Sequence, residues 1–243
     1  MNNKSNAYTI IIKQTYKNYQ KEYNLKLPDI REVKYDKTDE FWGKFNTQDL
    51  YNKKYILHLC DDLLSENKKF MKQILYHEFT HLSDSLQFLD KSYKDFESIM
   101  QSYSEYHAAK VEMIERLNEI EPPVTLSSDI YHIGILTLES FMKQTFEHLL
   151  RDTNNLCSKL QPENFSYDVD NIYHFCGYVK ALQEYNIQYD YDLLKITPRY
   201  ALQCKNIFDC LLKDEIVIDD VYNTYQALEK SILNAALLGG LLK

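Results

Sequence analysis

Residues 74–84 read ILYHEFTHLSD, in which two histidines stand four positions apart and a glutamate directly follows the first. In an α-helix, residues four apart lie about 40° apart on one face and one turn apart along the axis. His77 and His81 can therefore direct two imidazoles at one tetrahedral ion. Helical H-E-x-x-H segments hold zinc in this way, so the stretch predicts a zinc site on a long helix.

The remainder of this helix, which we expect over about residues 63–89, provides its own core-facing surface. An aliphatic stripe on a face away from the histidines consists of Met71, Leu75, Leu82, Leu86 and Leu89. The opposite, solvent-facing side is predicted to carry Lys72, Tyr76, Ser83 and Gln87. Because aliphatic residues already supply the core face, the two histidines are not needed as core filler.

Glu78 falls between the histidine face and the core face of the same helix. There its carboxylate can reach a zinc-bound water and take its proton, which is general-base catalysis of the metallopeptidase type. The alternative is that the pentapeptide arises by coincidence in an ordinary helix.

A catalytic zinc site has three protein ligands and one open position, so a third ligand is needed. Asp84 and Gln87 stand where metzincins have glycine and histidine, which excludes that class. Gluzincins take a glutamate from the next helix, and Glu105 lies 24 residues beyond His81, in a helix expected over about 93–119. Small residues on its face would allow two helices to approach closely, namely Ser98, Ser102, Ala108 and Ala109.

Other residues compete for this role, and Glu105 itself may be read as a solvated helix carboxylate. Asp84 shares the histidine face, where it suits either a hydrogen bond to an imidazole N–H or a surface position. Glu112 lies two turns beyond Glu105 and is expected to pair with Arg116. His107 points away from Glu105 and is interpreted as an ordinary polar histidine.

The flanking sequence predicts an α+β, mainly helical fold. Residues 6–24 have helical periodicity, whereas IREVKYD (30–36) and KKYILHLC (53–60) predict strands of a small antiparallel sheet, with turns between them. The Pro pair in EIEPPVTLSSD (119–129) marks a boundary between a core at 1–120 and an all-helical region at 121–243. The helices of that region are expected at about 130–151, 168–186, 191–213 and 217–238.

Charge and composition exclude several classes of protein. The net charge of −8 and the lack of basic runs argue against nucleic acid as a partner. No signal-like or membrane-spanning apolar stretch is present, so we expect a cytoplasmic protein without a membrane partner. The five cysteines are scattered without a C-x-x-C pair, so any zinc must be held by histidine and carboxylate.

The order of helix, small sheet, H-E-x-x-H helix and a helix with E-x-x-A at Glu105–Ala108 resembles the minimal zincin core of the ImmA/IrrE family of bacterial metallopeptidases. The likeness covers about residues 1–120. It implies zinc ligands at His77, His81 and Glu105, with Glu78 as base, and YILHL (55–59) as the edge strand along which a peptide lies. It also implies an intracellular substrate, such as a regulator encoded by a mobile element.

We therefore expect a zinc-dependent endopeptidase that acts on an intracellular protein or peptide. The alternative is a zinc-containing binding or regulatory module with little or no proteolytic activity; purely structural zinc would leave Glu78 without a purpose. The residue that stabilises the transition state stays open, with His132, His148 and His174 in apolar helical segments as candidates. The sequence does not specify an oligomeric state.

Overall fold

The computed structural model describes residues 3–38, 41–119, 132–133, 136–158, 165–192 and 201–238. Helices dominate these residues and the strands are few, which confirms the α+β, mainly helical fold class. The chain divides into two compact units, Met1–Met100 and Gln101–Lys243. The predicted boundary between 120 and 121 lies outside the described residues.

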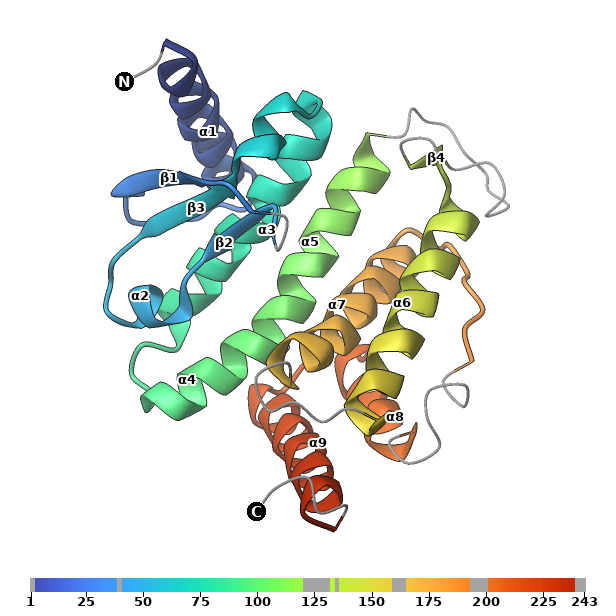
Figure 1. Cartoon of the computed structure of the whole chain (residues 1–243). Coiled ribbons are helices and arrows are strands. Elements are labelled where there is room, and N and C mark those ends of the chain that lie inside the picture. Colours follow the sequence, from blue (N-terminus) through green and yellow to red (C-terminus); the bar gives the residue numbers. More distant parts are fainter. Residues whose placement is uncertain are drawn as a thin grey trace. The chain divides into compact units, whose positions relative to one another are not determined.

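The first unit combines helices with a small sheet. Its helices are α1 (Asn3–Glu22), α2 (Thr47–Tyr51), the 3-10 helix η1 (Asp61–Ser65), α3 (Lys68–Gln87) and α4 (Tyr93–Ile99). Its strands are β1 (Glu32–Asp36), β2 (Gly43–Phe45) and β3 (Ile56–Cys60). Figure 1 shows the three strands laid across α3.

The sheet has the order β1-β3-β2 and is mixed. β2 runs antiparallel to β3 as predicted, but β1 pairs parallel with β3, so the expectation of a purely antiparallel sheet is wrong. The order also corrects the predicted edge strand, because β3 (Ile56–Cys60) lies in the centre. The physical reason is the connection between β1 and β3, which passes through β2 and α2 and returns the chain in the same direction.

Most of residues 43–51 fold into regular elements where turns were predicted, whereas Asn52 and Lys53 form a turn. Gly43–Phe45 form β2, with Phe45 opposite Leu57 of β3. Helix α2 follows, and the side chain of Asn46 caps it by accepting a hydrogen bond from the Gln48 N–H. The short strand β2 lies at an edge of the three-stranded sheet.

Helix α3 is mostly buried, which corrects part of the predicted solvent face: Gln87 is exposed as predicted and Lys72 is half-buried, but the other two residues are not in solvent. Tyr76 and Ser83 are buried although the periodicity placed them in solvent. Tyrosines of α1 cover this side: the rings of Tyr19 and Tyr76 meet edge to face with centroids 5.1 Å apart, and Tyr16 meets Phe79 in the same way at 4.8 Å. The aromatic residues of α1 thus shield α3 from water.

The second unit is mainly helical, but residues 132–133 and 136–137 pair as a two-stranded ribbon where the start of a helix over 130–151 was predicted, so that helix begins only at Leu138. This unit contains α5 (Glu105–Asn118), β4 (His132–Ile133), β5 (Leu136–Thr137), α6 (Leu138–Ser158), α7 (Phe165–Glu184), α8 (Ala201–Leu211) and α9 (Ile218–Leu238). Just before α5 the helix adopts a π-helical turn, η2 (Met100–Ser104). The widened turn changes the angular spacing, so residues before Glu105 do not share its face as a regular helix would predict.

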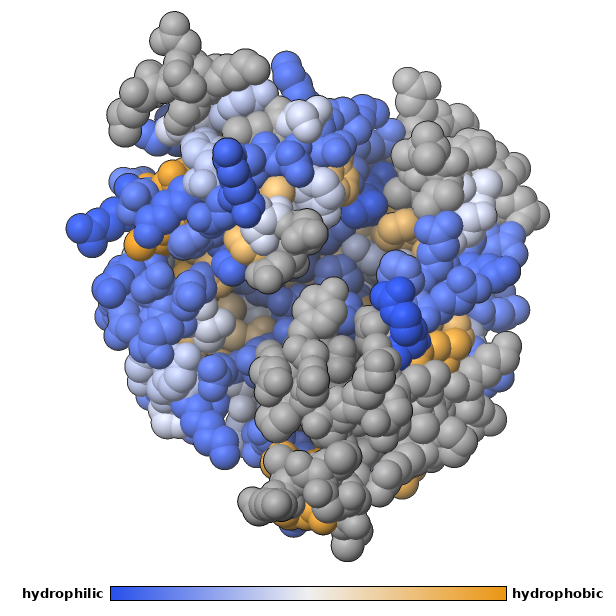
Figure 2. Space-filling view, in the orientation of Figure 1, coloured by the Kyte–Doolittle hydropathy of each residue, from blue (hydrophilic) through white to orange (hydrophobic). Residues whose placement is uncertain are grey.

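The cysteines lie in the interior, and the surface is mainly polar. Cys60, Cys176, Cys204 and Cys210 are buried, and the described surface visible in Figure 2 is mostly hydrophilic. Within the described residues, no helix is long and apolar enough to cross a membrane.

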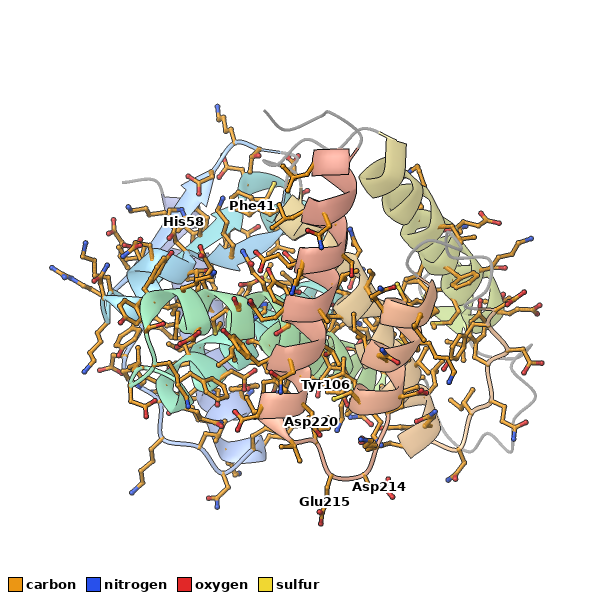
Figure 3. All side chains as sticks on the ribbon, turned by 90° about the horizontal axis from the view of Figure 1, so that it is seen from below. Phe41, His58, Tyr106, Asp214, Glu215 and Asp220 are labelled. Carbon is orange, nitrogen blue, oxygen red and sulfur yellow. The ribbon has the colours of Figure 1, made fainter. Side chains whose placement is uncertain are left out.

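The turn between α8 and α9 is held by a lysine from α7. Lys180 Nζ donates to the carbonyls of Leu212 and Lys213, and lies 3.5 Å from a carboxylate oxygen of Asp214. Figure 3 shows Asp214 and Glu215 projecting from this turn. The cation thus satisfies carbonyl groups just beyond the end of α8.

Helices α5 and α7 pack closely because α7 has a glycine at the contact (Figure 1). A Cβ atom on Gly177 would lie 2.3 Å from the carbonyl oxygen of Tyr106, 2.8 Å from the backbone nitrogen of Lys110 and 2.9 Å from the Ala109 Cβ. The two backbones can approach this closely only with hydrogen at this position.

We expect Gly177→Ala to lower the free energy of unfolding by at least about 1–3 kcal/mol, because backbone atoms of α5 must move to admit the methyl group. Chemical denaturation of the native protein and the variant measures the difference. An unchanged denaturation midpoint would show that the two helices are more loosely packed than described.

Candidate metal centre

The two histidines of the motif converge on one point. His77 and His81 lie one turn apart on α3, each side chain directs its Nε2 atom toward the other, and the two atoms are 3.1 Å apart. The ring planes are inclined at 75°. Both residues are buried, each with 9% of its surface exposed. Two imidazole nitrogens are thus held side by side, away from bulk water.

This spacing fits zinc. With Zn–N bonds of about 2.0–2.1 Å and tetrahedral angles, two ligating nitrogens lie about 3.3–3.4 Å apart. The observed 3.1 Å requires an adjustment of only a few tenths of an ångström. A hydrogen bond between the two rings is compatible with the same distance when one nitrogen is protonated and the other is not. With that small adjustment, the two nitrogens can serve as two ligands of one metal ion.

Glu78 is fixed by the edge strand of the sheet. It is 4% exposed, and its Oε2 accepts a hydrogen bond of 3.1 Å from the backbone N–H of Phe45 in β2. A Cβ on Gly43 would lie 2.9 Å from Glu78 Cγ and 3.3 Å from Ile74 Cγ2, so β2 crosses directly over this glutamate. The carboxylate is therefore oriented by a main-chain group beside the histidine pair.

For the zinc endopeptidase that the sequence predicts, Gly43→Ala should reduce peptide cleavage about tenfold or more while zinc binding persists. The added methyl group would overlap the Glu78 side chain and displace its carboxylate, without touching either histidine ring. Turnover and zinc content of the purified variant provide the measurement. If the variant loses zinc as well as activity, the added methyl group also disturbs the metal ligands and not Glu78 alone.

Thr80 and Asp84, the other polar residues of the motif, are fully buried. The Thr80 hydroxyl donates to the Tyr76 carbonyl and lies 3.0 Å from the Tyr19 hydroxyl of α1. Burial, and to a lesser degree the Asp84 charge, raise the pKa of Tyr19. The surface position considered for Asp84 is therefore wrong, because α1 covers this part of α3.

Glu105 belongs to the second unit, and its role as third ligand stays a prediction. It begins α5, and its Oε2 lies 3.7 Å from His174 Nδ1 of α7. Ala109, one of the small residues predicted to admit the histidine helix, instead meets Gly177 of α7. The small side chain at this position thus serves packing within the second unit.

The predicted pairing of Glu112 with Arg116 is confirmed. The guanidinium donates from Nε at 3.1 Å and from Nη2 at 2.5 Å to one carboxylate oxygen of Glu112. The Tyr178 hydroxyl donates to the same oxygen at 2.9 Å. His107 contacts the ring of Tyr103, with centroids 5.8 Å apart, in keeping with an ordinary half-buried histidine.

The sequence pattern did not reveal two features of the candidate site. It did not connect Gly43 and Phe45 with Glu78, because that contact joins residues 33 positions apart along the chain. It left His174 as one of three candidate histidines, whereas the structure places this residue beside two glutamates. A usable signal was the spacing of Glu105 and Glu112, which are seven apart and therefore share a helix face. Of the other two candidates, His132 lies on strand β4 and not in a helix as predicted, and His148 is exposed on α6.

No protein-family model, curated protein or solved structure matches this chain. The resemblance to the ImmA/IrrE family consequently rests on the residues of the motif and on the order of the elements.

Proposed function

We propose that this protein is a zinc-dependent endopeptidase that hydrolyses peptide bonds of a protein or peptide substrate. The observation that carries the proposal is the arrangement on α3: two imidazole nitrogens 3.1 Å apart, followed by a buried glutamate that the edge strand holds in place. A site that only held metal would have no need for this glutamate.

In this proposal His77, His81 and Glu105 hold the zinc ion. Zinc, when bound, lowers the pKa of a coordinated water toward about 7 and polarises a carbonyl group. Glu78 accepts the proton of the attacking water and later delivers it to the leaving amine. The Phe45 N–H stabilises the charged form of Glu78 and keeps the carboxylate from rotating away.

The position of β2 supports a peptide as the substrate. Among the residues that the structure describes, β2 pairs with β3 on one side and with no strand on the other, so its other side is an edge of the sheet. The Phe45 N–H that reaches Glu78 is on that outer side, because a backbone group cannot serve β3 and α3 together. A substrate strand that pairs with β2 would therefore run past the general base in an extended conformation.

The test is cleavage of a peptide library by the zinc-loaded protein, read by mass spectrometry. We expect a set of cleaved sequences with a common preference around the scissile bond, abolished by a zinc chelator and restored by added zinc. A protein that holds zinc and cuts neither the library nor denatured proteins would instead be a zinc-containing binding or regulatory module.

The substrate implied by the resemblance is an intracellular regulator, such as one encoded by a bacterial mobile element. This narrower assignment depends on the family likeness. Cleavage sites found in the library can be searched for in candidate repressors, which are then tested as intact proteins.

A further inference from the structure

Two carboxylates of α5 are bridged by one histidine of α7. Glu105 and Glu112 are seven residues apart, so their side chains leave the helix about 20° apart in angle and two turns apart along the axis. His174 Nδ1 lies 3.7 Å from Glu105 Oε2, and its Nε2 lies 3.8 Å from Glu112 Oε2. Each ring nitrogen therefore faces a different carboxylate.

The far end of this bridge is firmly held. Glu112 is 3% exposed, and its other oxygen accepts hydrogen bonds from Arg116 and from the Tyr178 hydroxyl. Burial above all, and the Glu112 charge, raise the pKa of Tyr178 well above its usual value, so the phenol keeps the proton that it donates. The same tyrosine contacts the edge of the His174 ring, with centroids 4.7 Å apart. Glu112 and Tyr178 together define where the imidazole can lie.

The backbone beneath the bridge has little freedom as well. Gly177, three residues beyond His174, lies against the main chain of Tyr106 and Lys110. The Cα positions of His174 and Glu105 are thereby set by direct contact between α7 and α5. In contrast to these buried anchors, the Glu105 and His174 side chains are 22% and 28% exposed, so the near end of the bridge is open to solvent.

We propose that His174 is a positioning residue for Glu105: its Nδ1, at ion-pair distance from one carboxylate oxygen, attracts that oxygen and leaves the other for the metal. The inference rests on the proposed function, in which Glu105 is the third zinc ligand. Carboxylates that bind metals are commonly oriented by a second hydrogen-bonding group, and loss of such a group typically weakens metal binding about 10–100-fold. In this chain of contacts, Arg116 and Tyr178 hold Glu112, Glu112 orients His174, and His174 in turn orients Glu105.

The test measures zinc affinity of the full chain by competition with a chromophoric chelator. We expect His174→Ala to weaken zinc binding about 10–100-fold, whereas His174→Gln, which keeps a polar N–H group near Glu105, retains part of the affinity. His148→Ala is the matched control, because it removes an exposed histidine from the same unit, and its affinity is expected to equal that of the native protein.

A double-mutant cycle separates positioning from general stability. Glu112→Gln is expected to weaken zinc binding in the native protein but to have no further effect once His174 is alanine, since Glu112 acts through His174. The visible spectrum of the cobalt-substituted protein provides a second readout, because a reoriented carboxylate changes the ligand field in His174→Ala.

The outcomes are distinguishable. Native zinc affinity in His174→Ala, together with loss of affinity in Glu105→Ala, would overturn the positioning role and leave the proposed zinc site intact. Native affinity in Glu105→Ala would overturn both, because Glu105 would then not be a ligand.

Discussion

Glu78→Gln is expected to lower turnover of a cleaved peptide by roughly 10²–10⁴-fold and to leave one zinc ion bound per chain. The amide has nearly the shape of the carboxylate, and its oxygen can still accept the hydrogen bond from the Phe45 N–H. It cannot, however, accept a proton from the attacking water. Steady-state kinetics and elemental analysis of the same preparation measure the two quantities.

The control for this variant is Glu66→Gln, which makes the same chemical change at an exposed glutamate just before α3. It should retain native turnover. Cleavage by Glu78→Gln at the native rate would contradict the assignment of Glu78 as general base, and loss of zinc would show that the residue supports the metal instead.

Glu105→Ala is expected to weaken zinc binding by more than 10–100-fold. That range is typical when a residue that only orients a metal ligand is removed, whereas here the ligand itself is lost. Proteolytic activity should fall in parallel at limiting zinc and return only in part at high zinc, since the remaining two histidines leave the metal poorly held. Chelator competition measures the zinc affinity, and a titration of activity against free zinc measures how far added zinc restores cleavage.

Glu139→Ala is a suitable control for the removal of a carboxylate, because Glu139 is exposed on α6. Its zinc affinity is expected to be native. If Glu105→Ala binds zinc as tightly as the native protein, the third ligand is another residue.

Much of the architecture could be predicted because it depends on local patterns. The 3.6-residue periodicity identified α3 and most other helices, and the β-branched and aromatic runs identified β1 and β3. β2 escaped prediction because Gly43–Phe45 has no strand-like composition, and it pairs only because β3 and α3 hold it from two sides. The parallel pairing of β1 with β3 escaped prediction because it depends on the path of the whole connection between them.

Only the part of the site that lies within helix α3 could be predicted from the sequence. The spacing of His77 and His81 specifies their convergence, which the structure confirms. The solvent face assigned to Tyr76 was wrong because periodicity describes one helix, whereas burial depends on its neighbours, here the tyrosines of α1. The contacts of Glu78 with β2 and of His174 with α5 likewise arise from tertiary packing.

The central claim is that His77 and His81 bind zinc, and elemental analysis of the purified chain after zinc loading and dialysis tests it most directly. The account predicts about one zinc per native chain and little zinc in the double variant His77→Ala, His81→Ala. A native protein that retains no zinc after loading, or a double variant that retains as much as the native protein, would contradict it.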